Sequence, residues 1–311
     1  LPPDGGNNLG FDKLVKEVKN KILYGLDLDK LKEIYEKKIY NNKICIARGK
    51  LPIKGENGYI KWYFNFENKY KPKILKDGSV DYKNINLINN VKKGEKLAER
   101  IPATEGENGV TVTGEVIPAT KGQEVYLKIG QNVFLSEDEN AAYAIKDGQV
   151  VYRDGKISVY EVYDINGNVD NTTGNIYFNG MVKIKGNVLT GFYVKAMSDI
   201  EINGVVEGAI IESNGNVIVK RGIQGFHKGK LSCKGNIYTK FIENSNVQAN
   251  NDIHAEAIMH SKVISGNNIE VNGKKGLIVG GICKAKNEIK VKTIGSPMGT
   301  STVLEVGVDP E

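Results

Sequence analysis

The side chains that could perform acid–base or nucleophilic chemistry are few and widely separated in this sequence of 311 residues. Its three histidines are His227, His254 and His260, and neither of the last two has a serine or cysteine partner at a spacing typical of acyl transfer. His254 follows Ile253 at an outward strand position, and His260 lies near an expected corner. We therefore interpret the histidines as surface residues and expect no catalytic residues.

Acidic residues could support a second kind of chemistry, the cleavage of polysaccharides. A lyase needs acidic groups gathered on one face to bind Ca²⁺ and a basic residue near the sugar. After residue 174 the only arginine is Arg221, and the acidic residues are scattered, although Glu212 and Glu243 could meet across neighbouring coils. A glycan-binding or glycan-cleaving β-helix therefore stays open as a minor alternative.

Cysteines and lysine motifs indicate neither a metal nor a cofactor. Cys45, Cys233 and Cys283 include no CxxC pair, so we expect reduced thiols in a cytoplasmic protein. The segment at 225–229, GFHKG, is interpreted as a loop, because no GxxxxGK[ST] motif for binding phosphate occurs. The segment VKKGEKLAE resembles domains that carry biotin or lipoate, but no tripeptide with a modifiable lysine follows it.

Basic residues form the one candidate interaction surface. Thirteen lysine or arginine residues and only five acidic residues lie between positions 220 and 295. They could bind an acidic protein, an anionic polymer or RNA, but few aromatic residues interleave with them, which argues against nucleic acid. The alternative is that these lysines only prevent aggregation of strand edges. The candidate residues are Lys220, Arg221, Lys228, Lys230, Lys274, Lys275, Lys284 and Lys286.

A repeat in the second half of the chain predicts the elements that position these residues. A turn pair followed by a branched aliphatic residue recurs, in later units at steps of 16 to 20 residues. The first two steps, between residues 174 and 198, are 12 residues long and are interpreted as shortened entry turns.

Three columns of apolar residues align in the later units. The first is Ile200, Val217, Ile237, Ile253, Ile269 and Ile289. The second is Val206, Ile223, Ile242, Ile258, Ile278 and Ile294. The third is Ile210, Leu231, Val247, Val263, Ile282 and Val303.

One such unit cannot bury its own apolar face, but units stacked at ~4.8 Å would pair their strands in parallel and bury all three columns. The fold class is therefore mainly β, a three-faced parallel β-helix for which we expect right-handed crossovers. The irregular steps exclude the left-handed hexapeptide helix. Asparagine and glycine before each strand are expected to turn the corner with positive φ, and the asparagines to bond from coil to coil.

The part of the chain before the repeat predicts a smaller α+β region. Residues 11–40 have the spacing of two helices, with Asp12 expected to cap the first and Gly25 to end it. Residues 44–49 and 60–66 alternate as two strands, and Trp62, Phe64 and Phe66 are expected to bury one face of that hairpin. We predict three regions: an α+β domain at 1–92, a β-rich connecting region at 93–164 that packs against the solenoid end, and a solenoid at 165–311.

The overall composition favours a protein without a membrane segment. The net charge is only +6, no apolar run approaches the ~18 residues that would span a bilayer, and the first residues, LPPDGGNNLG, lack a signal-peptide core. We therefore expect a cytoplasmic location.

Several long motifs resemble the flagellar assembly protein A family. They are EGENGVTVTGEVIP (105–118), DGKISVYEVYDINGNVDNTTGNI (154–176), GNVLTGFYVKA (186–196), VEGAIIES (206–213), KFIENS (240–245), KKGLIVGGICKA (274–285) and KTIGSPMGTSTVLEVGVDP (292–310). The resemblance implies an N-terminal domain followed by a β-solenoid, a role in bacterial flagellar assembly or motility, and no established catalytic residues.

The function expected from these observations is that of a non-catalytic scaffold that binds protein components of flagellar assembly or its regulation. A polymer-forming cytoskeletal solenoid with stacked ends is the main alternative. Homo-oligomerisation stays open.

Overall fold

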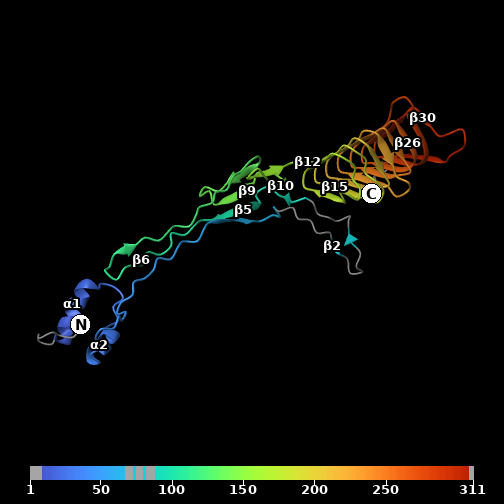
Figure 1. Cartoon of the computed structure of the whole chain (residues 1–311). Helices are drawn as coiled ribbons and strands as arrows, with labels where there is room; N and C mark the ends of the chain where they lie inside the picture. The colour runs from blue at the N-terminus through green and yellow to red at the C-terminus, as the bar shows by residue number, and fades with distance from the viewer. Residues whose placement is uncertain (1–8, 67–72, 75–79, 82–87, 308–311) are drawn as a thin grey trace. The chain divides into compact units, whose positions relative to one another are not determined.

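The computed structural model describes residues 9–66, 73–74, 80–81 and 88–307, and its fold is mainly β (Figure 1). The chain forms two compact units, each built from separate stretches of sequence. One comprises Leu1–Lys61 and Glu99–Leu127, and the other comprises Trp62–Ala98 and Lys128–Glu311. The boundaries expected at 92/93 and 164/165 stay predictions.

Two helices lie near the start of the first unit. They are α1 (Phe11–Lys21) and α2 (Leu28–Glu36). Asp12 is in the first turn of α1 rather than at its N-cap, which is Gly10, and the helix ends at Lys21 before Gly25. Gly25 instead allows a close approach of two chain segments, because a Cβ there would lie 1.9 Å from the carbonyl oxygen of Arg48.

The hairpin expected from residues 44–49 and 60–66 is not formed. Within 44–49 only Ala47 makes a bridge, to Leu26, and the second segment contributes β1 (Tyr59–Trp62). The sheet order is β1-β5-β9-β8, with β5 at Lys96–Ile101, β9 at Ala141–Ala144 and β8 at Val133–Leu135.

Phe64 and Phe66 gather around Trp62, but none of the three is buried: Trp62 and Phe64 are half-buried, and Phe66 is exposed. The ring centroid of Trp62 lies 5.6 Å from that of Phe64, 4.9 Å from that of Phe66 and 4.7 Å from that of Tyr152. The alternation therefore predicted correctly that these aromatic side chains pack together. They pack against Tyr152, which is far away in the sequence, and not against the expected neighbouring strand of a hairpin.

Two short antiparallel pairs complete the part before the solenoid. They are β6 (Gly109–Val110) with β7 (Val116–Ile117), and β2 (Lys73–Ile74) with β3 (Val80–Asp81). In the first unit, glycine permits close backbone contact: a Cβ at Gly109 would lie 2.5 Å from the carbonyl oxygen of Lys50.

A three-stranded antiparallel sheet lies against the first coil of the solenoid, and its contacting residue Asn90 belongs to the predicted 1–92 domain rather than to the connecting region. Its order is β11-β10-β4, with β11 at Lys156–Tyr160, β10 at Gly148–Arg153 and β4 at Asn90–Val91. The Asn90 side chain donates to the carbonyl oxygen of Tyr177 at 2.8 Å and accepts from the amide of Asn179 at 2.9 Å. These bonds satisfy backbone groups at the end of the stack.

The solenoid has three faces of parallel strands, drawn as successive coils in Figure 1. Face 1 is the sheet β12 (Val162–Ile165), β14 (Met181–Ile184), β16 (Ile200–Ile202), β19 (Val217–Val219), β22 (Ile237–Thr239), β25 (Ile253–Ala255), β27 (Asn268–Val271) and β29 (Glu288–Val291). Face 2 comprises β17 (Val205–Glu207), β20 (Gly222–Gln224), β23 (Phe241–Glu243) and β30 (Thr293–Ile294). Face 3 comprises β13 (Ile176–Phe178), β15 (Tyr193–Ala196), β18 (Ile210–Ser213), β21 (Lys230–Cys233), β24 (Asn246–Ala249) and β31 (Thr302–Val306). Two long strands, β26 (Ala257–Ser265) and β28 (Leu277–Ala285), run from face 2 into face 3.

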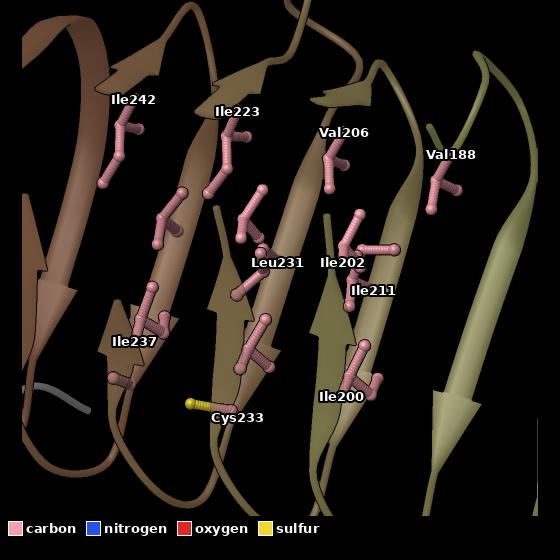
Figure 2. Packing of buried hydrophobic residues seen from close by; sticks show 14 of the residues in the cluster. Val188, Ile200, Ile202, Val206, Ile211, Ile223, Leu231, Cys233, Ile237 and Ile242 are labelled. Carbon is pink, nitrogen blue, oxygen red and sulfur yellow. The ribbon is translucent and has the colours of Figure 1, made fainter. Parts of the chain in front are cut away.

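The strand register confirms the first two predicted columns, although their last members are not buried, since Ile289 is half-buried and Ile294 is 56% exposed. Each member pairs with the next, from Ile200 with Val217 to Ile269 with Ile289, and from Val206 with Ile223 to Ile278 with Ile294. Figure 2 shows part of the resulting core, in which side chains from successive coils meet inside the solenoid.

The third column is wrong by one residue in three coils. Its inward members are Ile211, Leu231, Val247, Val263, Cys283 and Leu304. The predicted Ile210, Ile282 and Val303 are the outward neighbours, since adjacent strand residues point to opposite faces. Ile210 and Val303 are 38% and 39% exposed, whereas Ile211 is fully buried.

The interpretation of shortened entry turns is also wrong. Gly174-Asn175 precedes β13 on face 3, Gly186-Asn187 precedes Val188 in line with face 2, and Ser198-Asp199 precedes β16 on face 1. The early coils have full length, because Val162 pairs with Met181 and Val182 pairs with Ile200. The 12-residue steps therefore connect different corners of the solenoid.

Corner asparagines do bond from coil to coil, as expected. The Oδ1 atom of Asp199 accepts from the amide of Asn216 at 2.7 Å, and that of Asn216 accepts from the amide of Asn236 at 2.9 Å. The ladder continues to Asp252 and Asn268, each at 3.0 Å. Each side chain therefore satisfies a backbone donor at the next corner.

The glycines at these corners have a different role from the one expected. Gly174 has positive φ, but Gly186, Gly215 and Gly235 do not. A Cβ at Gly215 would lie 2.1 Å from Oδ1 of Asp199, and one at Gly186 would lie 2.2 Å from Oδ1 of Asn168. Close approach to the preceding coil, rather than left-handed backbone, therefore requires glycine at these positions.

Candidate interaction surface

Outward side chains of face 1 form a regular column across the coils. The register places Glu201, Ile218, Tyr238, His254, Glu270 and Lys290 in consecutive coils. The rings of Tyr238 and His254 stack with centroids 4.9 Å apart, and Nδ1 of His254 lies 3.1 Å from Oε2 of Glu270. His254 is therefore outward, as predicted, and contacts side chains of both neighbouring coils.

On face 3 a tyrosine, a lysine and a glutamate form a second cross-coil cluster. The Tyr193 hydroxyl donates to Oε2 of Glu212 at 2.7 Å, and Nζ of Lys195 lies 3.1 Å from the same oxygen. Desolvation by burial, followed by the bond to Glu212, raises the pKa of Tyr193 to about 12. Hydrogen bonds from the Tyr193 hydroxyl, which contributes most, and from Lys195 lower the pKa of Glu212. This cluster stabilises the pairing of β15 with β18.

The eight predicted basic residues are distributed over the solenoid rather than gathered in one strip. The corner between faces 1 and 2 holds Lys220, Arg221, Lys274 and Lys275; face 3 holds Lys230 and Lys284; the other two corners hold Lys228 and Lys286. Two of them are paired, because Lys220 lies 2.6 Å from Glu201 and Lys284 lies 2.6 Å from Glu305.

Two of the corners that are longer than their equivalents carry basic residues. Eight positions separate Ile223 from Leu231, where five separate Ile242 from Val247 in the next coil. The inserted residues belong to the loop GFHKG at 225–229. A similar insertion, NGKKG at 272–276, contains Lys274 and Lys275. Insertions in repeat proteins map to loops that often line the binding face.

The GFHKG loop borders a hollow of about 270 Å³ at the corner between faces 2 and 3. Lysines from two coils line it, because Lys230 pairs with Asn246 and Asn246 pairs with Lys262 in the strand register. Sequence reasoning missed Lys262 and treated His227 and His260 as separate surface residues. Only the alignment of face 3 would have brought them together. The complete lining is His227, Lys228, Gly229, Lys230, Asn244, Ser245, Asn246, His260 and Lys262.

Glu212 and Glu243, the two acidic residues that could have met across neighbouring coils, lie on different faces. Glu212 lies on face 3 in register with Ser232, whereas Glu243 lies on face 2 in register with Met259. Among the described residues, no group of three or more histidine, cysteine or acidic residues is placed to hold a metal ion.

The cysteines are free thiols, of which Cys233 and Cys283 are buried. Burial raises their pKa values to about 11 and about 12. A thiol with so high a pKa is a poor nucleophile at neutral pH. Neither buried cysteine is therefore suited to covalent chemistry.

The fold and this surface define a repeat protein whose β-solenoid displays ordered columns of side chains. Residues 1–155 match the family model described as the Flagellar Assembly Protein A N-terminal region, and residues 161–311 match the model of the Flagellar Assembly Protein A beta solenoid domain. The chain belongs to the Flagellar Assembly Protein A family. This membership relates it to flagellar assembly.

Comparison with curated proteins and with solved structures found no significant match. Within the described ranges, no helix combines the length and apolar character that crossing a membrane requires.

Proposed function

We propose that this chain is a non-catalytic, cytoplasmic scaffold that brings together protein components of bacterial flagellar assembly. The observation that carries the proposal is the register of the solenoid, which holds outward side chains of eight stacked face 1 strands in columns at a repeat of ~4.8 Å. Such a surface is extended and preorganised, so a partner can bind it without an ordering cost on this side.

Face 1 is the part of this surface that we assign to protein contacts. Tyr238 and His254 form an aromatic pair on its outer side, flanked by Ile218 and Glu270, with Glu201 and Lys290 one coil further out. Aromatic residues surrounded by charged groups are typical of the centre of a protein interface. A polymer of stacked solenoids is disfavoured, because the β4-β10-β11 sheet is hydrogen-bonded to the first coil through Asn90.

The test is replacement of the chromosomal gene in the native host. We expect deletion to reduce the number of flagella, counted by electron microscopy, and to reduce swimming. Tyr238→Ser with His254→Ser should reproduce part of that defect while the protein stays folded, because both side chains point outward. Lys274→Ser with Lys275→Ser, in the inserted loop, is the matched control. Unaltered flagella and swimming after deletion would remove the assignment.

A further inference from the structure

Unusual backbone conformations concentrate at the corner between faces 2 and 3. Five consecutive coils have an equivalent position here, and φ is positive at four of them, Gly208, Asn244, His260 and Gly280, but not at Gly225. Glycine and asparagine are the usual residues for this conformation, but His260 adopts it with φ 48°. Phe226 and His227, in the inserted loop, adopt it as well. Among the described residues of the solenoid, those with positive φ that are not glycine are Phe226, His227, Asn244 and His260.

Strained residues of this kind persist where the surroundings hold them, and they cluster at ligand-binding sites. A glycine in place of His260 would relieve the strain. His260 is among the residues that line the hollow, and its imidazole packs over Gly280 of the next coil, where a Cβ would lie 2.5 Å from its Nδ1 atom. A strained histidine therefore stands at a position where glycine occurs in other coils, at Gly208 and Gly280.

The charge around this hollow is of one sign. Lys228, Lys230 and Lys262 line it, and no carboxylate does. None of these three lysines forms an ion pair with a described residue, whereas Lys195 and Lys284 on the same face each pair with a glutamate one coil away. Two other hollows of the solenoid unit contain acidic and basic residues together.

The geometry suits a single anionic group. Lys230 and Lys262 flank Asn246 in register, each one coil of ~4.8 Å away, so both ammonium groups can reach an atom placed over Asn246. The side chains of Asn244 and Asn246 make no hydrogen bond to any described residue, and their amide groups can donate there. Lys228 and His227 approach from the inserted loop.

We propose that this hollow is a binding site for a phosphate monoester. Three lysines carry three positive charges, so one carboxylate would leave most of the charge unbalanced. A phosphate monoester brings a charge of about −1.5 to −2 and three acceptor oxygens. The lysines and asparagines supply the donors that these oxygens need. The site does not depend on the scaffold function, since it is formed entirely within the solenoid.

Isothermal titration calorimetry of the whole chain tests the site with O-phosphoserine, inorganic phosphate and glutarate as probes. We expect O-phosphoserine to bind with 1:1 stoichiometry and glutarate to bind much more weakly. If inorganic phosphate binds as tightly as O-phosphoserine, the result would support a site that recognises the phosphate group and makes no contact with the rest of the ligand. Equal binding of glutarate would overturn the proposal, because the hollow would then respond to negative charge in general.

Variants locate the binding. Lys230→Gln with Lys262→Gln should weaken O-phosphoserine binding about tenfold or more, since two charged contacts are lost. Lys274→Gln with Lys275→Gln removes the same charge at the other inserted loop and should leave affinity within about twofold. Equal losses in the two double variants would contradict a local site.

The His260→Gly variant distinguishes an effect on O-phosphoserine binding from an effect on the stability of the fold. It relieves the left-handed histidine, so the thermal unfolding midpoint should rise or stay the same. Because His260 lines the hollow, O-phosphoserine affinity should fall at the same time. Unchanged affinity in this variant and in Lys230→Gln with Lys262→Gln would overturn the proposal.

Discussion

At the scale of single residues, neighbouring side chains on one strand contribute very unequally to stability. Ile211 is fully buried in the core, whereas the side chain of Ile210 points outward and is 38% exposed. Both are isoleucines on β18, so any difference between them arises from orientation alone. The cost of removing apolar volume depends on whether a cavity is left in a packed interior.

We expect Ile211→Ala to lower the free energy of unfolding by about 2–5 kcal/mol, because it opens a cavity between Val194 and Leu231. Ile210→Ala should cost less than about 1 kcal/mol, since surface substitutions have small effects. Urea denaturation of both variants measures the difference. Equal destabilisation would show that Ile210 and Ile211 do not differ in orientation on β18.

Glycines at one corner can be compared in the same way. Gly186 and Gly167 occupy the same corner of successive coils, and neither has positive φ. A Cβ at Gly186 would lie 2.2 Å from Oδ1 of Asn168, whereas no heavy atom lies within 4 Å of one at Gly167.

Gly186→Ala should therefore destabilise the solenoid by about 1–3 kcal/mol, because the coils must separate or shift. Gly167→Ala should be neutral or stabilise by up to about 1 kcal/mol, since alanine restricts the unfolded chain. The thermal unfolding midpoints of the two variants provide the comparison. A similar loss in both would mean that corner flexibility, rather than contact between coils, requires glycine.

At the scale of strands, polar groups join each strand to the next across the outer surface. Tyr193, Lys195 and Glu212 connect β15 with β18. Because the Glu212 pKa is lowered in the folded state, the folded state favours its ionised form. The stabilisation is present above the ordinary pKa and is lost as the pH falls through the folded value.

The pH dependence of stability tests this strand contact. Between pH 6 and pH 3 we expect the unfolding midpoint of the native chain to fall, and Glu212→Gln to show a smaller fall. Glu243→Gln is a suitable control, because Glu243 forms no ion pair with a described residue. If both variants follow the native profile, the contact between β15 and β18 makes no measurable contribution.

At the scale of the whole molecule, the unit of the solenoid is the coil. Each coil contacts only its neighbours, so the stability of such a stack is approximately a sum over coils and their interfaces. Ile253 pairs with Ile269, and residues 253–268 therefore form one complete coil of 16 residues. Its removal would place Ile269 directly after Asp252, in the position that Ile253 now occupies.

We expect a chain that lacks residues 253–268 to fold with unchanged strand character and a lower unfolding midpoint. Deletion of residues 253–267, one residue fewer, would place Asn268 in the core position and turn the following aliphatic residue outward. That second chain should fail to fold or aggregate. Circular dichroism and urea denaturation distinguish the two, and equal tolerance would contradict a continuous stack of columns.

The recurrence of branched aliphatic residues was enough to predict the architecture and two of the three core columns. Ile200, Ile237 and Ile253 stand beside polar residues, so only one register buries them. The third column was ambiguous, because Ile210-Ile211, Ile282-Cys283 and Val303-Leu304 each offer two apolar residues in succession. The family motifs likewise indicated an N-terminal region followed by a solenoid.

The sequence by itself therefore determined the solenoid and its family, because burial of repeated apolar residues leaves few alternatives. Only the tertiary structure decided which of two adjacent apolar residues faces inward, why corner glycines are needed, and which lysines share a hollow. Those features depend on how neighbouring coils align, for example on the register that places Lys230 and Lys262 on either side of Asn246. Register and close approach between coils are set by packing, and local sequence preference does not specify them.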